Sequence, residues 1–330
     1  MRSDGPIPAG KLSPELLDEL IKKYTFGDDS IVVGPGVGED AAVIEAGKGL
    51  LIVKTDPITF VTESMGSYLV QVNANDIAAM GGEPRWFMVT LLLAEYGTTP
   101  GYVRSCFMQI SEACKELGIV YCGGHTEVTV GLPRPMAIGV MVGEVDRGRL
   151  VRTSGAVPGD DIILTKGAAI EATSIVARER GEELAARYSE DFVRRCRDFV
   201  TEPGLSVLNE ARLALDAGRV HCMHDPTEGG VITALHEIAS AAGTGLHVVG
   251  ADIPIAEETR TACGDYGIDP LGALSSGALL LTVAPEESRT VVGALNDGGI
   301  EAAVIGRVQD EDHGRTIETE KGVEALPVFA

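Results

Sequence analysis

The stretch VQVNANDIAAMGGEPRWFMVTLLLAEY occupies residues 70–96 and changes character once along its length. Its first part is apolar with a short polar insertion, and it predicts a helix over residues 66–81. Gly81, Gly82 and Pro84 are typical of a helix end. The continuous apolar run that follows predicts a strand. A helix that passes directly into a strand favours a mixed α/β (α+β) fold for this part of the chain.

The same alternation continues on both sides of this stretch. Upstream, PELLDELIKKY at residues 14–24 predicts a helix with Ser13 as its N-cap, and two strand-like runs rich in Val and Ile follow it. Downstream, the pattern predicts a second helix over residues 100–117 and then two strands that flank a glycine turn. The first half of the chain is therefore expected to be a sheet with intervening helices.

A polar, turn-rich segment near residues 146–160 divides the chain in two. It predicts an N-terminal domain over residues 1–152 and a C-terminal domain over residues 153–330. A chain of 330 residues, of which 45% are hydrophobic, is long enough to form two cores. The second half is expected to contain helices over 169–180, 182–199, 204–216, 228–242 and 286–296. Its strands are expected near 161–165, 246–249, 278–283 and 302–308.

The composition excludes several classes of protein. A formal net charge of −22 argues against a nucleic-acid partner, because a phosphate backbone requires a basic surface. It does not argue against a nucleotide, since magnesium can bridge carboxylates and a triphosphate. No apolar run reaches the roughly 18–20 residues of a membrane span, and the first residues do not resemble a signal peptide. A cytoplasmic protein without a membrane partner is therefore expected.

The cysteines and histidines do not predict a zinc site. Six cysteines are scattered without a C-x-x-C pair, which favours free thiols. The cluster His221-Cys222-Met223-His224 lacks the second half of a zinc ligand set at a usable spacing.

Short polar insertions break otherwise apolar runs, and each places an acid beside small residues. They are GVGEDAA (36–42), KTD (54–56), NAND (73–76), GGHTE (123–127) and HDPTEGG (224–230). Taken singly, a turn or a helix cap explains each of them better than a site does. None matches the P-loop or the G-x-G-x-x-G fingerprint. Together they indicate an acidic, glycine-lined site that suits a hard divalent cation such as magnesium.

The order of the motifs resembles a known superfamily. It is similar to the order found in the aminoimidazole-ribonucleotide-synthetase (PurM) superfamily. The motifs are, in order along the chain, GVGEDAAV, KTDPITF, VNANDIAAMGGEPRW, YCGGHTEV, VPGDDIIL, MHDPTEGGVITALHEIA and DPLGALSSGALLLTV. The resemblance covers residues 10–310, and its second half is most similar to the hydrogenase maturation branch, HypE. The superfamily that this chain resembles also includes thiamine-monophosphate kinase and selenophosphate synthetase.

The resemblance implies a fold and an activity. It implies a two-domain PurM-like fold, in which the N-terminal sheets of two subunits form an intersubunit β-barrel in a homodimer. It also implies that ATP binds near that interface and that Mg²⁺ bridges its phosphates to the acids. The implied reaction is ATP- and Mg-dependent activation of a small-molecule, oxygen-bearing substrate, by phosphorylation or dehydration. A maturation-type protein partner is expected as well.

The resemblance also assigns roles to individual residues. The implied metal or phosphate ligands are Asp40, Asp56, Asp76 and Asp225. The implied nucleotide contacts are Gly36, Gly38, Lys54, Asn75, Thr227 and Gly229. His125 stands where the superfamily usually carries an acid after Gly-Gly, and Glu127 shares its face of the strand. His125 and Glu127 are therefore the candidate catalytic residues.

The sequence departs from HypE at both ends. It lacks the N-terminal His-Gly-Ala-Gly-Gly signature, and it ends in VEALPVFA in place of the Pro-Arg-Ile-Cys tail whose cysteine carries the carbamoyl group. A free small molecule or another acceptor is therefore expected as the substrate. Two alternatives stay open: a small-molecule kinase resembling thiamine-monophosphate kinase, and a non-catalytic nucleotide-binding scaffold.

Overall fold

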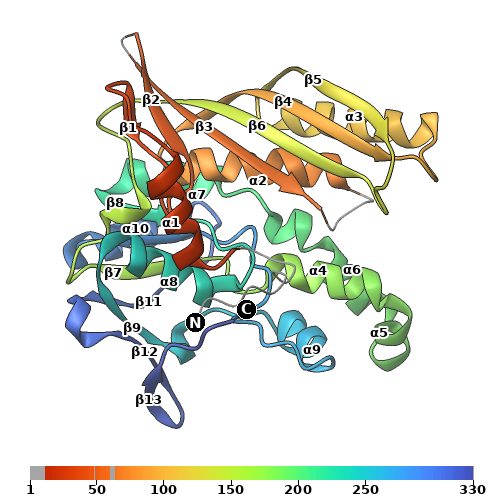
Figure 1. The fold of residues 1–330 in the computed structure, drawn as a ribbon. Helices are drawn as coiled ribbons and strands as arrows, with labels where there is room; N and C mark the ends of the chain where they lie inside the picture. The colour runs from red at the N-terminus through yellow and green to blue at the C-terminus, as the bar shows by residue number, and fades with distance from the viewer. Residues whose placement is uncertain (1–11, 48, 60–63, 330) are drawn as a thin grey trace.

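Two sheets with packed helices form the molecule (Figure 1). The computed structural model describes residues 12–47, 49–59 and 64–329. The N-terminal sheet has six strands in the order β1-β2-β3-β6-β4-β5, and the C-terminal sheet has seven in the order β13-β12-β9-β11-β7-β10-β8. The mixed α/β fold in two domains is therefore confirmed, whereas the proposed boundary after residue 152 stays a prediction.

The elements of the N-terminal half follow the predicted alternation. Its helices are α1 (Pro14–Tyr24), α2 (Met65–Ala79) and α3 (Pro100–Glu116). Its strands are β1 (Ile31–Val33), β2 (Ala42–Ala46), β3 (Gly49–Ile58), β4 (Glu83–Ala94), β5 (Val120–Thr129) and β6 (Met136–Val145). The predicted cap at Ser13 is present, because its hydroxyl accepts a hydrogen bond from the Leu16 amide at 3.3 Å.

The C-terminal half has more elements than the sequence predicts. Its helices are α4 (Ile170–Glu179), α5 (Gly181–Arg187), α6 (Glu190–Asp198), α7 (Leu208–Ala217), α8 (Gly230–Ala242), α9 (Glu257–Gly264) and α10 (Pro285–Asp297). Its strands are β7 (Asp161–Thr165), β8 (Val220–His224), β9 (Gly245–Val249), β10 (Leu280–Val283), β11 (Ala302–Gln309), β12 (Arg315–Thr319) and β13 (Gly322–Ala325). Short helical turns are η1 (Thr153–Gly155), η2 (Val200–Gly204), η3 (Gly250–Asp252) and η4 (Glu311–His313).

The predicted helices over 182–199 and 204–216 are wrong in their bounds. The first is two helices, α5 and α6, because the Ser189 hydroxyl accepts from the Phe192 amide at 3.0 Å and so begins a new helix. The second begins only at Leu208, since residues 200–204 form the separate turn η2. The structure also adds β1, β8, α9, β12 and β13, which the sequence patterns do not predict.

Helices cover one face of the N-terminal sheet. The alternate residues Phe87, Val89, Leu91 and Leu93 of β4 are buried in the core that α2 and α3 help to form. The residues between these positions point to the opposite face of the sheet and are partly exposed. In Figure 1 none of the described helices lies over that opposite face. We call it the open face of the sheet; its apolar members are Leu51, Val53, Trp86, Met88, Leu92, Ile138, Val140 and Val142.

The open sheet ends at β5, which pairs only with β4 among the described strands. Glycine is required there, because a Cβ at Gly124 would lie 1.8 Å from the carbonyl oxygen of Val89. The six strands do not close into a barrel within the described part of one chain.

The helix α2 belongs to both halves of the molecule. Thirteen of its residues are buried, among them Leu69 and Ile77 in the core of the N-terminal sheet. Tyr68 and Ala79 of the same helix pack instead against residues of the C-terminal half. Polar side chains on α2 are therefore held between the two sheets.

Among the described helices, none is long and apolar enough to cross a membrane.

Candidate functional site

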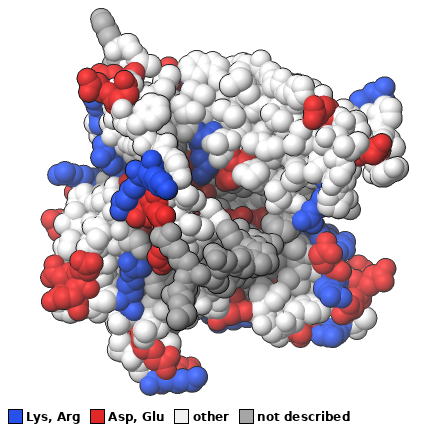
Figure 2. Space-filling view, viewed as in Figure 1, with Lys and Arg blue, Asp and Glu red and all other residues white. Residues whose placement is uncertain are grey.

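The predicted acids gather between the two sheets around one lysine. Lys54 and Asp56 are alternate residues of β3 and so share the face that α2 covers. Lys54 Nζ lies 3.0 Å from Asp76 Oδ1 on α2 and 3.9 Å from Asp56 Oδ2. Asp40 precedes β2, and Asp225 follows β8. Figure 2 shows charged side chains recessed between the upper and lower parts of the molecule.

Burial and like charges govern the ionisation of these acids. Burial raises the pKa of Asp76 to about 7, and Lys54 opposes this rise while Asp40 and Asp56 add to it. Burial also raises the pKa of Asp225 well above its usual range, with further contributions from Asp76 and Asp40. Burial alone would lower the pKa of Lys54, but the carboxylates around it outweigh this effect and raise it. The lysine therefore stays charged, and the cluster holds more acid than one cation balances.

A histidine that sequence reasoning did not assign to the site lies at its centre. His224 Nδ1 lies 2.5 Å from Asp40 Oδ1, and its Nε2 lies 2.9 Å from Glu237 Oε2 on α8. The Thr153 hydroxyl donates to Asp40 Oδ2 at 3.1 Å. Burial lowers the pKa of His224, but Asp40 and Glu237 more than offset it and raise the pKa well above its ordinary value. These contacts hold Asp40 in one orientation.

The geometry fits a divalent cation. Asp40, His224 and Asp225 are buried, and one ligand atom from each lies within 4.8 Å of the others. Asp76 Oδ2 is buried and has no hydrogen-bond partner among the described residues. This carboxylate oxygen is therefore available to bind a cation. Carboxylate oxygens are the ligands that magnesium prefers, whereas both ring nitrogens of His224 face carboxylates, so this imidazole orients Asp40 and is not itself free to bind a metal.

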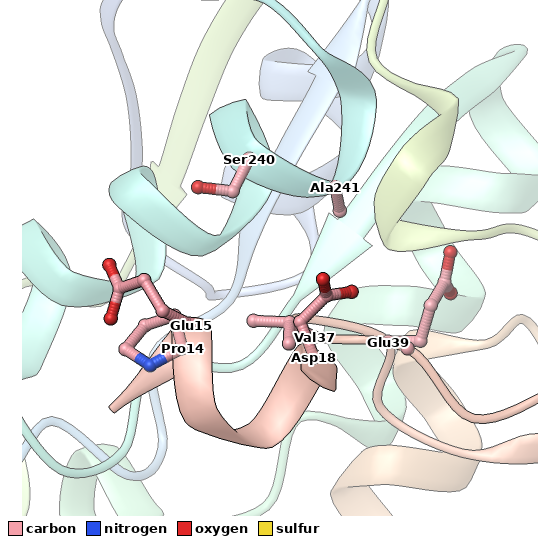
Figure 3. Close-up of a pocket in the computed structure, with 8 residues that line it drawn as sticks. Pro14, Glu15, Asp18, Val37, Glu39, Ser240 and Ala241 are labelled. Atoms are coloured by element: carbon pink, nitrogen blue, oxygen red, sulfur yellow. The ribbon is translucent and has the colours of Figure 1, made fainter. Parts of the chain in front are cut away.

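The glycine loop lies beside this cluster and against α8. Gly38 has a φ of +87°, and a Cβ there would lie 3.0 Å from the carbonyl oxygen of Glu237. Gly36 lines an open cavity of about 460 Å³ between α1 and α8. In Figure 3 the carboxylates of Glu15, Asp18 and Glu39 and the hydroxyl of Ser240 surround this cavity. The loop therefore connects an acidic depression with Asp40.

Thr227 and Gly229 lie where the sequence places them, at the start of α8. The carbonyl oxygen of Thr227 accepts from the Gly230 amide at 3.1 Å, and Gly229 adopts a φ of +79° as the residue before the helix. The amides of a first helical turn and the helix dipole favour an anion. A phosphate contact at Thr227 and Gly229 stays a prediction.

Asn75 has contacts of a different kind. Its amide nitrogen donates to the carbonyl oxygen of Leu205 at 2.8 Å, and its oxygen accepts from the Val207 amide at 3.0 Å. Both contacts join α2 to the segment before α7 and are buried. The structure therefore shows a role for Asn75 in holding the two halves together, and its nucleotide contact stays a prediction.

His125 and Glu127 lie apart from the acidic cluster within one chain. They share a face of β5, with His125 Nε2 3.2 Å from Glu127 Oε2, and their side chains are 65% and 50% exposed. His125 pairs with Thr90, which belongs to the open face, whereas Lys54 lies on the covered face. β6 and β4 also separate β5 from β3. One chain does not bring these two residues to the cluster, so their catalytic role stays a prediction.

We expect the metal-free protein to become more stable as the pH falls from about 7 to about 4 through Asp76. The pKa of Asp76 is about 7 in the fold and 3.8 for an unperturbed aspartate, so the folded protein binds a proton that the unfolded chain releases. The protonated Asp76 makes its full contribution to the free energy of unfolding below pH 3.8, and this contribution is lost as the pH rises through 7. The difference between the two limits is a few kcal/mol. Thermal unfolding in EDTA between pH 4 and 8 measures it. Asp76→Asn should flatten this dependence, and an unchanged slope would contradict the assignment.

Two domains of one known protein family match most of the chain. The N-terminal domain of the family described as AIR synthase related protein matches residues 38–145, and its C-terminal domain matches residues 157–318. A putative hydrogenase expression/formation protein of Methanocaldococcus jannaschii is 26% identical over 94% of this chain and 91% of its own length. Carbamoyl dehydratase HypE of Rhizobium leguminosarum is 27% identical over 92% of this chain and 85% of its own length.

Solved structures show the same fold. A crystal structure of a HypE–HypF complex matches with a TM-score of 0.77 and 22% identity, covering 95% of this chain and 99% of the other. HypE in complex with ATP matches with a TM-score of 0.74 and 24% identity, covering 94% of each chain. Thiamine monophosphate kinase of Aquifex aeolicus matches with a TM-score of 0.69 and 18% identity, covering 92% and 95%. These likenesses confirm the PurM-like fold of the two domains.

Proposed function

Because this chain belongs to the AIR synthase related protein family and is a HypE-like enzyme of the PurM superfamily, we propose that it uses ATP to dehydrate or phosphorylate a small oxygen-bearing substrate. The observation that carries the proposal is the buried cluster of Asp40, Asp76 and Asp225 around Lys54. Relatives named carbamoyl dehydratase favour dehydration, and the HypE structure with ATP supports the nucleotide.

The residues of the cluster divide the work of binding MgATP. We assign Asp40, Asp56, Asp76 and Asp225 to magnesium, which would offset the charge of the triphosphate when bound. Lys54 stays protonated and supplies a positive charge at the same place. The start of α8, with Thr227 and Gly229, offers backbone amides to a phosphate oxygen. Glu237 and His224 act through Asp40, whose carboxylate they orient.

The substrate is proposed to be a free small molecule. The C-terminal segment contacts α8 and the loop before β10: the carbonyl oxygen of Pro327 lies 2.9 Å from His236 Nε2 on α8, and the Phe329 ring packs against Gly272. Neither of these contacts involves Asp76 or Asp225. A maturation-type protein is proposed as a partner, because a HypE relative is solved in a complex with HypF.

A homodimer is proposed on the basis of the open face of the N-terminal sheet. Trp86 and Met88 on this face are 39% and 41% exposed. Apolar surface on this scale usually marks a protein–protein interface. Pairing two such sheets would cover the face, remove the free edge and bring His125 and Glu127 of each subunit to a shared interface.

Titration with ATP tests the proposal. We expect about one ATP per subunit in the presence of magnesium and a much weaker interaction in EDTA, because the acids repel a triphosphate that no metal neutralises. Isothermal titration calorimetry measures both. A mass-spectrometric assay of ATP with candidate carboxamides then tests dehydration. Turnover of thiamine monophosphate would favour the kinase alternative, and tight binding without any turnover would favour a scaffold.

A further inference from the structure

A second polar cavity lies on the segment that joins the two halves of the chain. Its volume is about 380 Å³, which is the size of a site for a small metabolite. It lies between residues 148–157 and the turn from α7 to β8, with Arg149, Arg219 and His221 among its lining residues. We call it the linker pocket. It is distinct from the acidic cluster, none of whose carboxylates lines it.

The imidazole of His221 is fixed in orientation by a buried acid. Its Nδ1 lies 2.9 and 3.0 Å from the two carboxylate oxygens of Asp160. Asp160 also accepts from the Val157 amide at 3.0 Å and the Thr282 hydroxyl at 3.1 Å, so the carboxylate is itself held in place. Nδ1 therefore carries the proton that Asp160 accepts, and Nε2 has no partner among the described residues.

A free guanidinium lies beside this imidazole. Arg219 is exposed and makes no ion pair or hydrogen bond with the described residues. Asp216, which does not line the pocket, is already paired with Arg149 at 2.9 Å and with Arg212 at 3.8 Å. Glu287 is the other acid nearby, since a Cβ at Gly218 would lie 2.5 Å from its Oε2. In a chain with a net charge of −22, two arginines line this cavity, and Arg219 has no acidic partner among the described residues.

Two elements connect the linker pocket with the acidic cluster. β8 carries His221 at the pocket and His224 at the cluster. In η1, Gly155 packs against the carbonyl oxygen of His221, where a Cβ would lie 2.1 Å away, while Thr153 donates to Asp40. Cys222 also donates to the carbonyl oxygen of Thr153 at 3.1 Å, which ties the two elements together. A ligand that shifts either element therefore acts on the residues that hold Asp40.

We propose that the linker pocket binds a small phosphate-bearing anion through Arg219 and His221, and that its occupancy changes the affinity of the acidic cluster for MgATP. A guanidinium is a strong donor to phosphate oxygens, and the unpaired Nε2 of His221 can accept from the hydroxyl of a singly protonated phosphate group. A cavity of about 380 Å³ has the volume for a phosphate with a small organic group. The anion site does not require the proposed dehydration activity, because it uses none of the residues assigned to it.

Inorganic phosphate is the first probe, titrated into the magnesium-free and ATP-free protein and followed by ³¹P NMR line broadening. We expect a dissociation constant on the order of 1 mM. Arg219→Glu should weaken phosphate binding about tenfold or more, because a charged donor becomes a like charge. The matched control is Arg260→Glu on α9, which is exposed, has no ion pair among the described residues and carries the same charge change. Asp225→Asn should leave phosphate binding intact.

Calorimetric titration of MgATP with and without saturating phosphate tests the coupling. We expect the dissociation constant for MgATP to change severalfold in the wild type and not in Arg219→Glu. No phosphate binding up to about 20 mM, equal weakening in Arg219→Glu and Arg260→Glu, or loss of binding in Asp225→Asn would each overturn the anion site. Phosphate binding that leaves the MgATP affinity of the wild type unchanged would overturn the coupling.

Discussion

Asp225→Asn is expected to weaken MgATP binding by about 100-fold while leaving the fold at least as stable as that of the wild type. The carboxylate lies in the buried group of Asp40, His224 and Asp225, whose polar atoms are within 4.8 Å of one another, so its loss removes negative charge where a cation would bind. Burial and the carboxylates of Asp76 and Asp40 raise its pKa, which means that the charged form is disfavoured in the fold. A neutral amide of the same shape relieves that repulsion. Calorimetric titration and thermal unfolding in EDTA measure the two effects.

The opposite signs of these effects separate a ligand from a structural acid. A residue needed for folding loses binding and stability together, whereas a cation ligand in an acidic cluster loses binding and gains a few degrees in Tm. Asp297→Asn, at the exposed end of α10, provides the matched control and should change neither quantity. Unchanged MgATP affinity in Asp225→Asn would remove this residue from the site. A clear fall in Tm would show that its carboxylate stabilises the fold.

The fold was predictable wherever local patterns and tertiary packing agree. The helix over 14–24 begins and ends as its cap and proline indicate, and α2 passes into β4 through Gly81 and Gly82 as the sequence implies. The strand β8 was missed because His221-Cys222-Met223-His224 has no clear alternation and reads as a polar cluster. Its strand conformation comes from pairing with β10, which a local pattern does not contain.

The acidic cluster was predictable in membership but not in arrangement. Asp40, Asp56, Asp76 and Asp225 come from segments far apart in the sequence, and only the packing of α2 between the sheets brings them together. The sequence does not place His224 in the cluster, since its partners Asp40 and Glu237 are distant in sequence. One sequence feature does point to His224 as a site residue: it directly precedes the candidate ligand Asp225 at the end of an apolar run.

His125 shows what a single chain leaves undecided. Its motif predicts a place in the site, yet β5 lies at the free edge of the sheet and its imidazole lies on the open face. A strand edge and an uncovered apolar face are both features that a second molecule completes. A sequence motif can therefore identify His125 as a candidate site residue. The residues that surround its imidazole in a dimer come from an interface that one chain does not contain.

Met88→Glu is expected to convert the proposed homodimer into a monomer. Met88 lies on the open face of β4, next to β6, and is 41% exposed in the single chain. If two such faces pack together, a carboxylate at this position is buried twice at a symmetric interface without a cation to pair with, and each burial costs several kcal/mol. The dissociation constant of the dimer should therefore rise roughly a thousandfold or more. Light scattering coupled to size exclusion measures the molar mass, which should fall from about twice the 34.6 kDa chain to one chain.

Val323→Glu is the matched control, because Val323 is 62% exposed on β13, at the opposite end of the molecule from the open face. This variant should keep the dimer, so that any dissociation in Met88→Glu reflects the open face and not an added charge. The same samples decide the place of His125 and Glu127. If the partner supplies them to the reaction, monomeric Met88→Glu loses turnover in proportion to dissociation, and raising its concentration restores both. A wild type that is already monomeric, or a Met88→Glu dimer, would place the interface elsewhere and leave His125 as an exposed residue of an edge strand.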